Sequence, residues 1–171
     1  MASVVLSIGS NLGDRLARLQ SVVSGLRGAV RAVSPVYETD AWGGVEQGPF
    51  LNAVLLADAP DLDGPGWLRR AHEFENAAGR VREQRWGPRT LDVDIVSCHD
   101  GDAEVRSDDP VLTLPHPLAH QRAFVLVPWL AAAPDAVLTV AGQPVPVADL
   151  LAALAAGDRD GVRRTDLVLV P

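Results

Sequence analysis

Two aspartates separated by one residue are the side chains of this sequence best suited to chemistry. Asp92 and Asp94 alternate with aliphatic residues, which is the pattern of a strand with one buried face. Successive side chains of a strand point to opposite faces, so both carboxylates project from one face, with Cα atoms roughly 6.5 to 7 Å apart. Oxygen ligands at this spacing suit one or two Mg ions that also bridge phosphates. The plainer alternative is an edge strand with solvated carboxylates.

A cluster of arginines precedes this pair, at Arg80, Arg82, Arg85 and Arg89. All 15 basic residues of the chain are arginines, because it contains no lysine. The absence of lysine excludes a Walker P-loop and a protein-kinase ATP site. Arginine presents a planar fork that matches phosphate oxygens, so we interpret the cluster as an anion site. A solvated basic loop is the alternative.

Composition limits the cellular setting and the partners. A length of 171 residues predicts one domain, residues 1–171, with its own core. The net charge of -7 argues against a non-specific nucleic-acid binder. Cys98 is the only cysteine, so no intramolecular disulfide can form, and the N-terminal residues show neither a signal peptide nor a membrane span. We therefore expect a cytoplasmic protein without a membrane partner.

The hydrophobic periodicity predicts strands and helices in the order β-α-β-β-α-β. Strands are predicted at residues 2–8, 30–39, 51–57 and around Asp92. Helices are predicted between Asp14 and Gly28 and between Asp63 and Gly79. This order is the ferredoxin-like arrangement, an α+β fold with helices packed on a mostly antiparallel sheet.

Less regular segments surround this core. The glycine-rich connection at residues 40–49 is longer than a hairpin needs and is typical of a binding loop. We expect an added hairpin and two C-terminal helical stretches, at residues 124–132 and 147–156. The remaining predictions are a surface loop at residues 101–110, a short strand or turn at 139–146 and an edge strand at 167–170.

Several motifs resemble, in the right order, those of the 6-hydroxymethyl-7,8-dihydropterin pyrophosphokinase family. Residues 85–96 match its signature, a Gly-Pro-Arg followed by Asp-aliphatic-Asp. The resemblance covers roughly residues 3–135. The other matching blocks are Gly9-Ser10-Asn11-Leu12, Ser34-x-x-Tyr37-x-Thr39, Phe50-Leu51-Asn52, Glu75, Gly79-Arg80-Val81-Arg82, Leu114-Pro115-His116-Pro117 and Arg122-Ala123-Phe124-Val125-Leu126.

The resemblance implies an enzyme that transfers pyrophosphate from ATP to 6-hydroxymethyl-7,8-dihydropterin, giving the pterin diphosphate and AMP in tetrahydrofolate biosynthesis. ATP is then the co-substrate, and two Mg ions are held by Asp92 and Asp94. Neighbouring folate-pathway enzymes are expected as partners on functional grounds. Two alternatives remain: a Mg-dependent phosphohydrolase or nucleotidyltransferase that uses the same aspartates, and a non-catalytic ferredoxin-like ligand-binding module.

The resemblance also implies roles for single residues. Glutamine is commoner in the family where this chain has His72, and proline where it has Asp40. From the residue types alone, His116 and each aromatic residue fit a structural role as well. The implied catalytic residues are Arg82, Arg89, Asp92 and Asp94. The implied ATP contacts are His72, Glu75, Arg80, Arg82, Arg85, Arg89, Ile95, Thr113, His116 and Arg122. The implied pterin contacts are Thr39, Asp40, Trp42, Phe50, Asn52, Trp86, Asp92 and Phe124, with Phe50 and Phe124 as the stacking pair.

Overall fold

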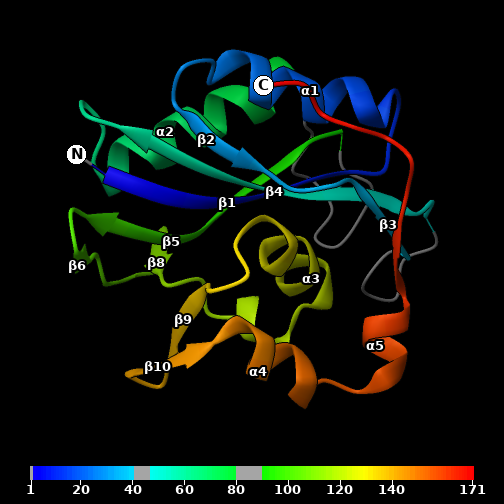
Figure 1. The fold of residues 1–171 in the computed structure, drawn as a ribbon. Helices are drawn as coiled ribbons and strands as arrows, with labels where there is room; N and C mark the ends of the chain where they lie inside the picture. The colour runs from blue at the N-terminus through cyan, green and yellow to red at the C-terminus, as the bar shows by residue number, and fades with distance from the viewer. Residues whose placement is uncertain (1, 41–46, 80–89) are drawn as a thin grey trace.

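A computed structural model describes residues 2–40, 47–79 and 90–171, and in it a seven-stranded sheet separates two layers of helices (Figure 1). The strand order is β11-β3-β4-β1-β5-β6, and β2 also pairs with β4. The strands of this sheet are β1 (Ala2–Ser10), β2 (Val30–Val33), β3 (Tyr37–Thr39), β4 (Phe50–Ala59), β5 (Asp92–Asp100), β6 (Ala103–Glu104) and β11 (Val162–Arg164).

Helices cover both faces of this sheet. On one face lie α1 (Arg15–Gly25) and α2 (Gly64–Ala77), and on the other lies α3 (Ala123–Ala132) (Figure 1). Below α3 follow α4 (Val147–Ala153) and α5 (Ala156–Asp160). A 3-10 turn (Ala119–Gln121) precedes α3. Two hairpins complete the fold, β7 (Ser107–Asp109) with β8 (Leu112–Leu114), and β9 (Val137–Val140) with β10 (Gln143–Pro146).

The two faces of the sheet form two cores, because β4 carries buried apolar side chains on both sides. In β4, Leu51 and Leu55 pack towards α1 and α2, whereas Val54 and Leu56 pack towards α3. This alternation is the period of two expected of a strand between two helical layers. A side chain near the end of a strand can therefore be assigned to a face from the position of its neighbours.

The topology confirms the predicted ferredoxin-like core. Strand β1 lies between β4 and β5 and pairs antiparallel with both. The remaining pairs of the main sheet, including β3 with β4, are antiparallel as well. Helices α1 and α2 connect β1 to β2 and β4 to β5. This is the split βαβ arrangement of an α+β fold.

Both helix starts were predicted correctly. The Asp14 carboxylate accepts the Ala17 N–H at 3.1 Å, and the Asp63 carboxylate accepts the Gly66 N–H at 2.8 Å. Each bond satisfies one of the amides that a helix leaves unpaired at its start. Gly79 follows α2 with a φ of +72°, a left-handed conformation that glycine adopts without strain.

The prediction of one strand at residues 30–39 is wrong, because the chain forms β2 and β3 with a break between them. Ser34 uses its side-chain oxygen to accept the Val54 N–H at 2.9 Å. Pro35 has no N–H to donate to the neighbouring strand. The break lets β3 leave the line of β2 while both strands still pair with β4.

Three predictions for segments after β5 also need correction. The helix predicted at residues 147–156 ends at Ala153, because Leu154 and Ala155 have extended backbones and α5 starts separately. Residues 167–170 form no strand; the edge strand of the tail is β11. The loop predicted at residues 101–110 instead contains β6 and β7. The strand or turn predicted at residues 139–146 is confirmed, as part of the β9–β10 hairpin. Within the described ranges, no helix is both long and apolar enough to cross a bilayer.

Candidate active site

The α3-facing side of the sheet carries the two aspartates predicted to act. Val93 and Ile95 of β5 are buried against α1 and α2, so Asp92 and Asp94, which alternate with them, face α3. Both aspartates are half-buried. In the register of the sheet, Asp92 lies opposite Gly9 of β1. The predicted projection of both carboxylates from one face agrees with this burial pattern.

The same face carries a buried pair of polar side chains. Asn52 of β4 lies opposite Gly9, so β1 separates it from Asp92 by one strand. The Asn52 side-chain amide donates to the Thr39 hydroxyl oxygen at 2.6 Å. Asn52 is 4% exposed and Thr39 is 5% exposed. The bond fixes both side chains and leaves the Asn52 carbonyl and the Thr39 hydroxyl proton for other partners.

Gly9 keeps space open beside this pair. A Cβ at Gly9 would lie 2.8 Å from Asn52 Oδ1 and 3.5 Å from Phe50 Cδ1. The first distance is shorter than ordinary contact, so a side chain at this position would displace Asn52. Phe50 lies opposite Thr39 in the ladder and therefore projects from the same face. Gly9 belongs to the first of the family-like motifs, but its steric role could not be predicted from the sequence because it depends on the register of β1 against β4.

His116 is bound to β5, the strand that begins with Asp92, and is held in a defined orientation. Its backbone N–H donates to the Val96 carbonyl of β5 at 2.8 Å, and its ring Nδ1 accepts the Leu118 N–H at 3.1 Å. The pKa of His116 is lowered to about 4, mainly by burial and also by the Arg122 guanidinium, whereas the Asp92 carboxylate acts in the opposite direction. The ring is therefore neutral near pH 7, with its proton on Nε2 as a donor.

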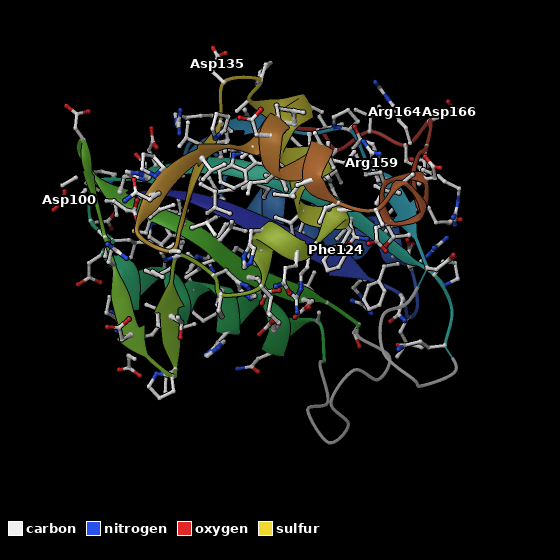
Figure 2. The ribbon with its side chains drawn as sticks, turned by 90° about the horizontal axis from the view of Figure 1, so that it is seen from below. Asp100, Phe124, Asp135, Arg159, Arg164 and Asp166 are labelled. Carbon is white, nitrogen blue, oxygen red and sulfur yellow. The ribbon has the colours of Figure 1, made fainter. Side chains whose placement is uncertain are left out.

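Arg122 and Phe124 stand at the start of α3. Arg122 is the residue before the first turn of the helix, and its Cζ lies 5.5 Å from the centre of the Phe124 ring. This distance is within the range of a cation–π interaction. Phe124 is partly buried against the α3 core (Figure 2). The start of α3 thus brings a cation and an aromatic face to the side of the sheet that carries Asp92.

Glu75 connects α2 to the strand of the aspartates. It is 2% exposed, and its Oε2 accepts the Val93 N–H at 3.0 Å. Val93 is the residue between Asp92 and Asp94. A buried carboxylate bound to this amide fixes the backbone at the point where both aspartates project. The family resemblance implies only an ATP contact for Glu75, and no pattern in the sequence of α2 indicates its bond to Val93.

Four further predicted site residues lie within the described part of the chain. The Ile95 side chain is buried in the core against α1 and α2, and the Thr113 hydroxyl donates to the Asp109 carbonyl at 3.0 Å. The Asp40 side chain is 82% exposed and forms an ion pair with Arg163 at 3.3 Å. His72 is half-buried on α2. The predictions that lie outside the described residues are Trp42, Arg80, Arg82, Arg85, Trp86 and Arg89.

The two carboxylates fit Mg as a metal shared with a ligand. In the part of the chain that the structure describes, no group of three or more His, Cys, Asp or Glu side chains could hold a metal. A closed structural site is therefore not formed by these residues. Mg is typically bound by one or two protein carboxylates together with substrate phosphates and waters, and Asp92 and Asp94 match that donor set.

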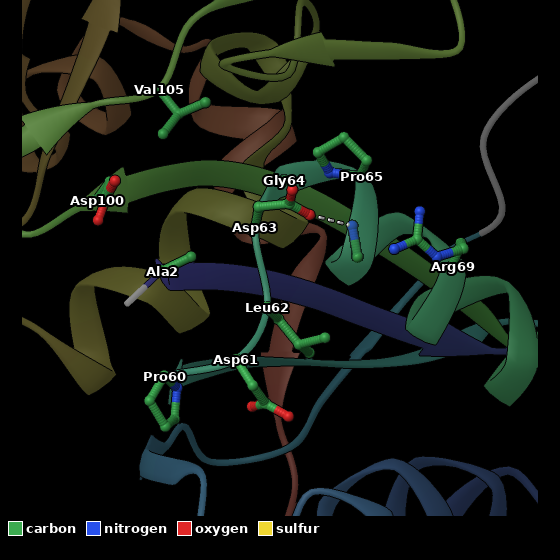
Figure 3. A pocket seen from close by; sticks show the side chains of 11 residues that line it. Ala2, Pro60, Asp61, Leu62, Asp63, Gly64, Pro65, Arg69, Asp100 and Val105 are labelled. Carbon is green, nitrogen blue, oxygen red and sulfur yellow. Dashed lines mark hydrogen bonds between the residues drawn. The ribbon is translucent and has the colours of Figure 1, made fainter.

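A separate pocket lies at the other end of the sheet (Figure 3). It has a volume of about 470 Å³ and includes Asp100, the last residue of β5, whereas Asp92 is the first. The two ends of this strand are roughly 25 Å apart. No residue predicted to act lines the pocket, so we do not assign it to the candidate site. Its other polar lining residues include Asp61, Asp63 and Arg69.

Comparison with known proteins adds independent findings. Residues 5–134 match the model of the family described as 7,8-dihydro-6-hydroxymethylpterin-pyrophosphokinase (HPPK). The chain is 64% identical over 168 residues to the 2-amino-4-hydroxy-6-hydroxymethyldihydropteridine pyrophosphokinase of Mycobacterium tuberculosis (strain ATCC 25618 / H37Rv), covering 95% of this chain and 89% of the relative. It is 33% identical over 147 residues to the protein of that name from Aquifex aeolicus, covering 85% of this chain and 89% of the relative.

Solved structures share the fold at low identity. The crystal structure of wild-type Plasmodium falciparum HPPK-DHPS with SDX-DHP superposes with a TM-score of 0.61 at 13% identity, covering 89% of this chain and 43% of that chain. A triple mutant of the same protein with pteroate gives a TM-score of 0.65 at 12% identity, covering 95% and 46%. This chain therefore spans less than half of those longer chains, and the likeness shows the fold.

Proposed function

Because the chain belongs to the 7,8-dihydro-6-hydroxymethylpterin-pyrophosphokinase family, we propose that it transfers pyrophosphate from ATP to 6-hydroxymethyl-7,8-dihydropterin. The products are AMP and the pterin diphosphate, and the reaction belongs to tetrahydrofolate biosynthesis. One observation carries the proposal for this chain: a single sheet face presents Asp92 and Asp94 beside the buried Asn52–Thr39 pair. The carboxylates proposed to bind Mg and phosphate therefore lie beside the polar side chains proposed to bind the pterin.

The pterin is bound by shape and by hydrogen bonds. It is a flat heteroaromatic ring with amide-like edges, so its site needs aromatic faces and fixed donors and acceptors. The Asn52 carbonyl and the Thr39 hydroxyl supply these polar contacts at a fixed spacing. Phe50 and Phe124 supply the aromatic faces. Gly9 leaves room for the pterin beside Asn52 and Phe50, because it has no side chain. Asp40, Trp42 and Trp86 complete the proposed pterin contacts.

The phosphates of ATP are bound by cationic and neutral donors. The charge of the transition state spreads over the phosphoryl oxygens, so catalysis rests on positioning and electrostatics. Arg122 supplies a permanent charge, and the Nε2–H of neutral His116 supplies a donor. Arg82 and Arg89 contact phosphate during the chemical step. The other proposed ATP contacts are His72, Glu75, Arg80, Arg85, Ile95 and Thr113.

Asp92 and Asp94 are the proposed ligands of two Mg ions. When bound, Mg neutralises phosphate charge and increases the acidity of the attacking hydroxyl. The pair accepts cations because both carboxylates are half-buried on one face. Asp92 also borders the pterin contacts, since only Gly9 separates it from Asn52 in the register.

The setting of the enzyme is part of the proposal. Residues 1–171 form one pyrophosphokinase domain that acts on small molecules rather than on nucleic acid or a membrane. A cytoplasmic location is supported by the use of ATP and by the buried free thiol of Cys98. A neighbouring folate-pathway enzyme is the proposed partner, since the Plasmodium structures are of longer HPPK-DHPS chains.

Product analysis tests the proposal. Purified protein is incubated with ATP, Mg and 6-hydroxymethyl-7,8-dihydropterin, and nucleotides and pterins are separated by chromatography. We expect AMP and the pterin diphosphate in equal amounts. ADP would indicate an ordinary kinase, and AMP formation without the pterin would indicate a phosphohydrolase or nucleotidyltransferase. ATP binding without turnover would indicate a non-catalytic module, and each of these three results would overturn the proposal.

A further inference from the structure

The C-terminal segment, residues 162–170, returns to the sheet beside β3, the strand that carries Thr39. It follows residues 5–134, which match the family, and runs from α5 along β3 to α1 (Figure 1). Strand β11 pairs antiparallel with β3, so Val162 lies opposite Thr39 and Arg163 opposite Glu38. The edge of β3 that does not pair with β4 is therefore paired with residues more than a hundred positions away in sequence. Any shift of this segment is transmitted to the backbone of Thr39 through the ladder.

The segment is anchored beyond β11 as well. Thr165 donates its N–H and its hydroxyl to the Val36 carbonyl, at 3.0 and 2.8 Å. Leu169 is 3% exposed and belongs to the core between the sheet and α1. Gln20 of α1 donates to the Val170 carbonyl at 2.8 Å and accepts the Val170 N–H at 2.9 Å. Hydrogen bonds and core packing thus hold the segment at the edge of β3 and against α1.

One side chain of β11 reaches both neighbours of Thr39. Arg163 Nη2 lies 3.3 Å from Asp40 Oδ1 and 3.8 Å from Glu38 Oε1. Glu38 Oε2 in turn accepts from Arg15 Nη1 at 3.0 Å. The same Nη1 donates to the Pro49 carbonyl at 3.1 Å, directly before Phe50. The two arginines therefore connect the start of α1, the strand of Thr39 and the residue before the proposed stacking phenylalanine.

This network contributes more to geometry than to stability. The Arg163 and Asp40 side chains are 48% and 82% exposed, and exposed ion pairs stabilise a fold little. The neighbouring pair is sensitive to position, because Asn52 donates to Thr39 at 2.6 Å within the buried face. A ligand that contacts both side chains requires them to stay within about 0.5 Å of their positions. An external brace on β3 serves that requirement.

We propose that Arg163 is a positioning residue for pterin recognition, which holds β3 through Glu38 and Asp40 so that Thr39 stays in register with Asn52. The proposal rests on the pterin-binding role proposed above for this pair. It extends the functional machinery to the C-terminal segment, which contributes no group to the chemistry. The expected specificity is for the pterin, since the ion pairs flank Thr39 and not the aspartates.

Steady-state kinetics of full-length Arg163→Ala tests the proposal, with Arg164→Ala as the matched control. Arg164 is the next residue of β11, is exposed, and has no ion pair among the described residues. We expect the KM for the pterin to rise roughly three- to tenfold in Arg163→Ala, with kcat and the KM for ATP unchanged. Arg163→Lys, which keeps the charge, is expected to restore most of the pterin affinity.

Three results would overturn the proposal: an unchanged pterin KM in Arg163→Ala, an equal rise in Arg164→Ala, or an equal rise in the KM for ATP. A general loss of structure is recognised by circular dichroism. Glu38→Gln, which removes the carboxylate charge shared by Arg163 and Arg15 and is not among the proposed pterin contacts, then replaces Arg163→Ala and is expected to raise the pterin KM in the same way; an unchanged pterin KM in Glu38→Gln would overturn the proposal as well. The wild-type product separates the two proposals, since ADP or no turnover would refute the function itself. AMP formation with normal pterin affinity in Arg163→Ala would refute only the role of Arg163.

Discussion

Replacement of Glu75 by alanine tests whether α2 positions the strand of the two aspartates. Glu75 is 2% exposed, and its carboxylate accepts the Val93 N–H at 3.0 Å. Alanine removes this acceptor while leaving the helix intact, because alanine is the best helix former. The Val93 amide then loses its bond to Glu75 at the position between Asp92 and Asp94.

The magnitude follows from two costs. A buried amide left without its acceptor costs about 1 to 3 kcal/mol. The four heavy atoms removed from a buried position leave a cavity, which adds about 1 kcal/mol or more. We therefore expect Glu75→Ala to lower the free energy of unfolding by about 2 to 4 kcal/mol. Glu75→Gln keeps an acceptor oxygen and nearly the same volume, so its loss is expected to be about half as large or less.

Urea denaturation followed by circular dichroism measures this loss, and a Mg titration of the initial rate reports the aspartates. Glu75→Ala is expected to need more Mg for half-maximal rate, because the backbone between its ligands is released. Glu73→Ala is the control, since Glu73 forms an exposed ion pair with Arg70 on the same helix and should change stability by less than about 1 kcal/mol. Wild-type stability and Mg dependence in Glu75→Ala would refute the reasoning.

Three further predictions concern the same face of the sheet. Gly9→Ala places a Cβ 2.8 Å from Asn52 Oδ1, so we expect the pterin KM to rise roughly tenfold with the fold retained, as measured by kinetics and circular dichroism; an unchanged KM would contradict the packing argument. The pKa of His116 is lowered to about 4, mainly by burial, so the unfolded chain binds this proton first as the pH falls. Its contribution to the stability of the metal-free protein is therefore complete above about pH 6.5 and lost towards pH 4, on the order of 2 kcal/mol. Urea midpoints of wild type should fall more steeply over this range than those of His116→Gln, and parallel curves would disprove the assignment. Phe124→Leu keeps most of the apolar volume but removes the ring, so it should weaken pterin binding relative to wild type by about 0.5 to 1.5 kcal/mol in a fluorescence titration, because only a ring stacks on the pterin; wild-type affinity in Phe124→Leu would argue against stacking.

Local patterns predicted the fold where its signals are local. The alternation around Asp92 predicted the strand that carries both aspartates and the face that they share, and Asp14 and Asp63 marked both helix starts. Ser34 and Pro35 interrupt a run that otherwise reads as one strand, because a side-chain hydrogen bond replaces a backbone bond there. The sequence contains the residues for this break, but its pairing with Val54 depends on the sheet.

Long-range pairing explains what the sequence could not predict. Strand β11 has two arginines in three residues, so its composition does not predict a strand. It is a strand because it pairs with β3. The contact of Glu75 with Val93 joins a helix to a strand across 18 positions. Gly9 acquires its role only because β1 places it between Asn52 and Asp92. In each case the signal lies in the register and not in the residue type.

The activity of Asp92→Asn and Asp94→Asn, measured with Mg as the only metal, shows directly whether these two carboxylates hold the metal that the reaction requires. Asparagine keeps the shape and one oxygen but removes the charge that binds Mg. We expect kcat to fall about a thousandfold or more in each variant, equivalent to about 4 kcal/mol of transition-state stabilisation, while the far-ultraviolet circular dichroism stays that of wild type. Wild-type rates of AMP and pterin diphosphate formation in either variant would contradict this assignment.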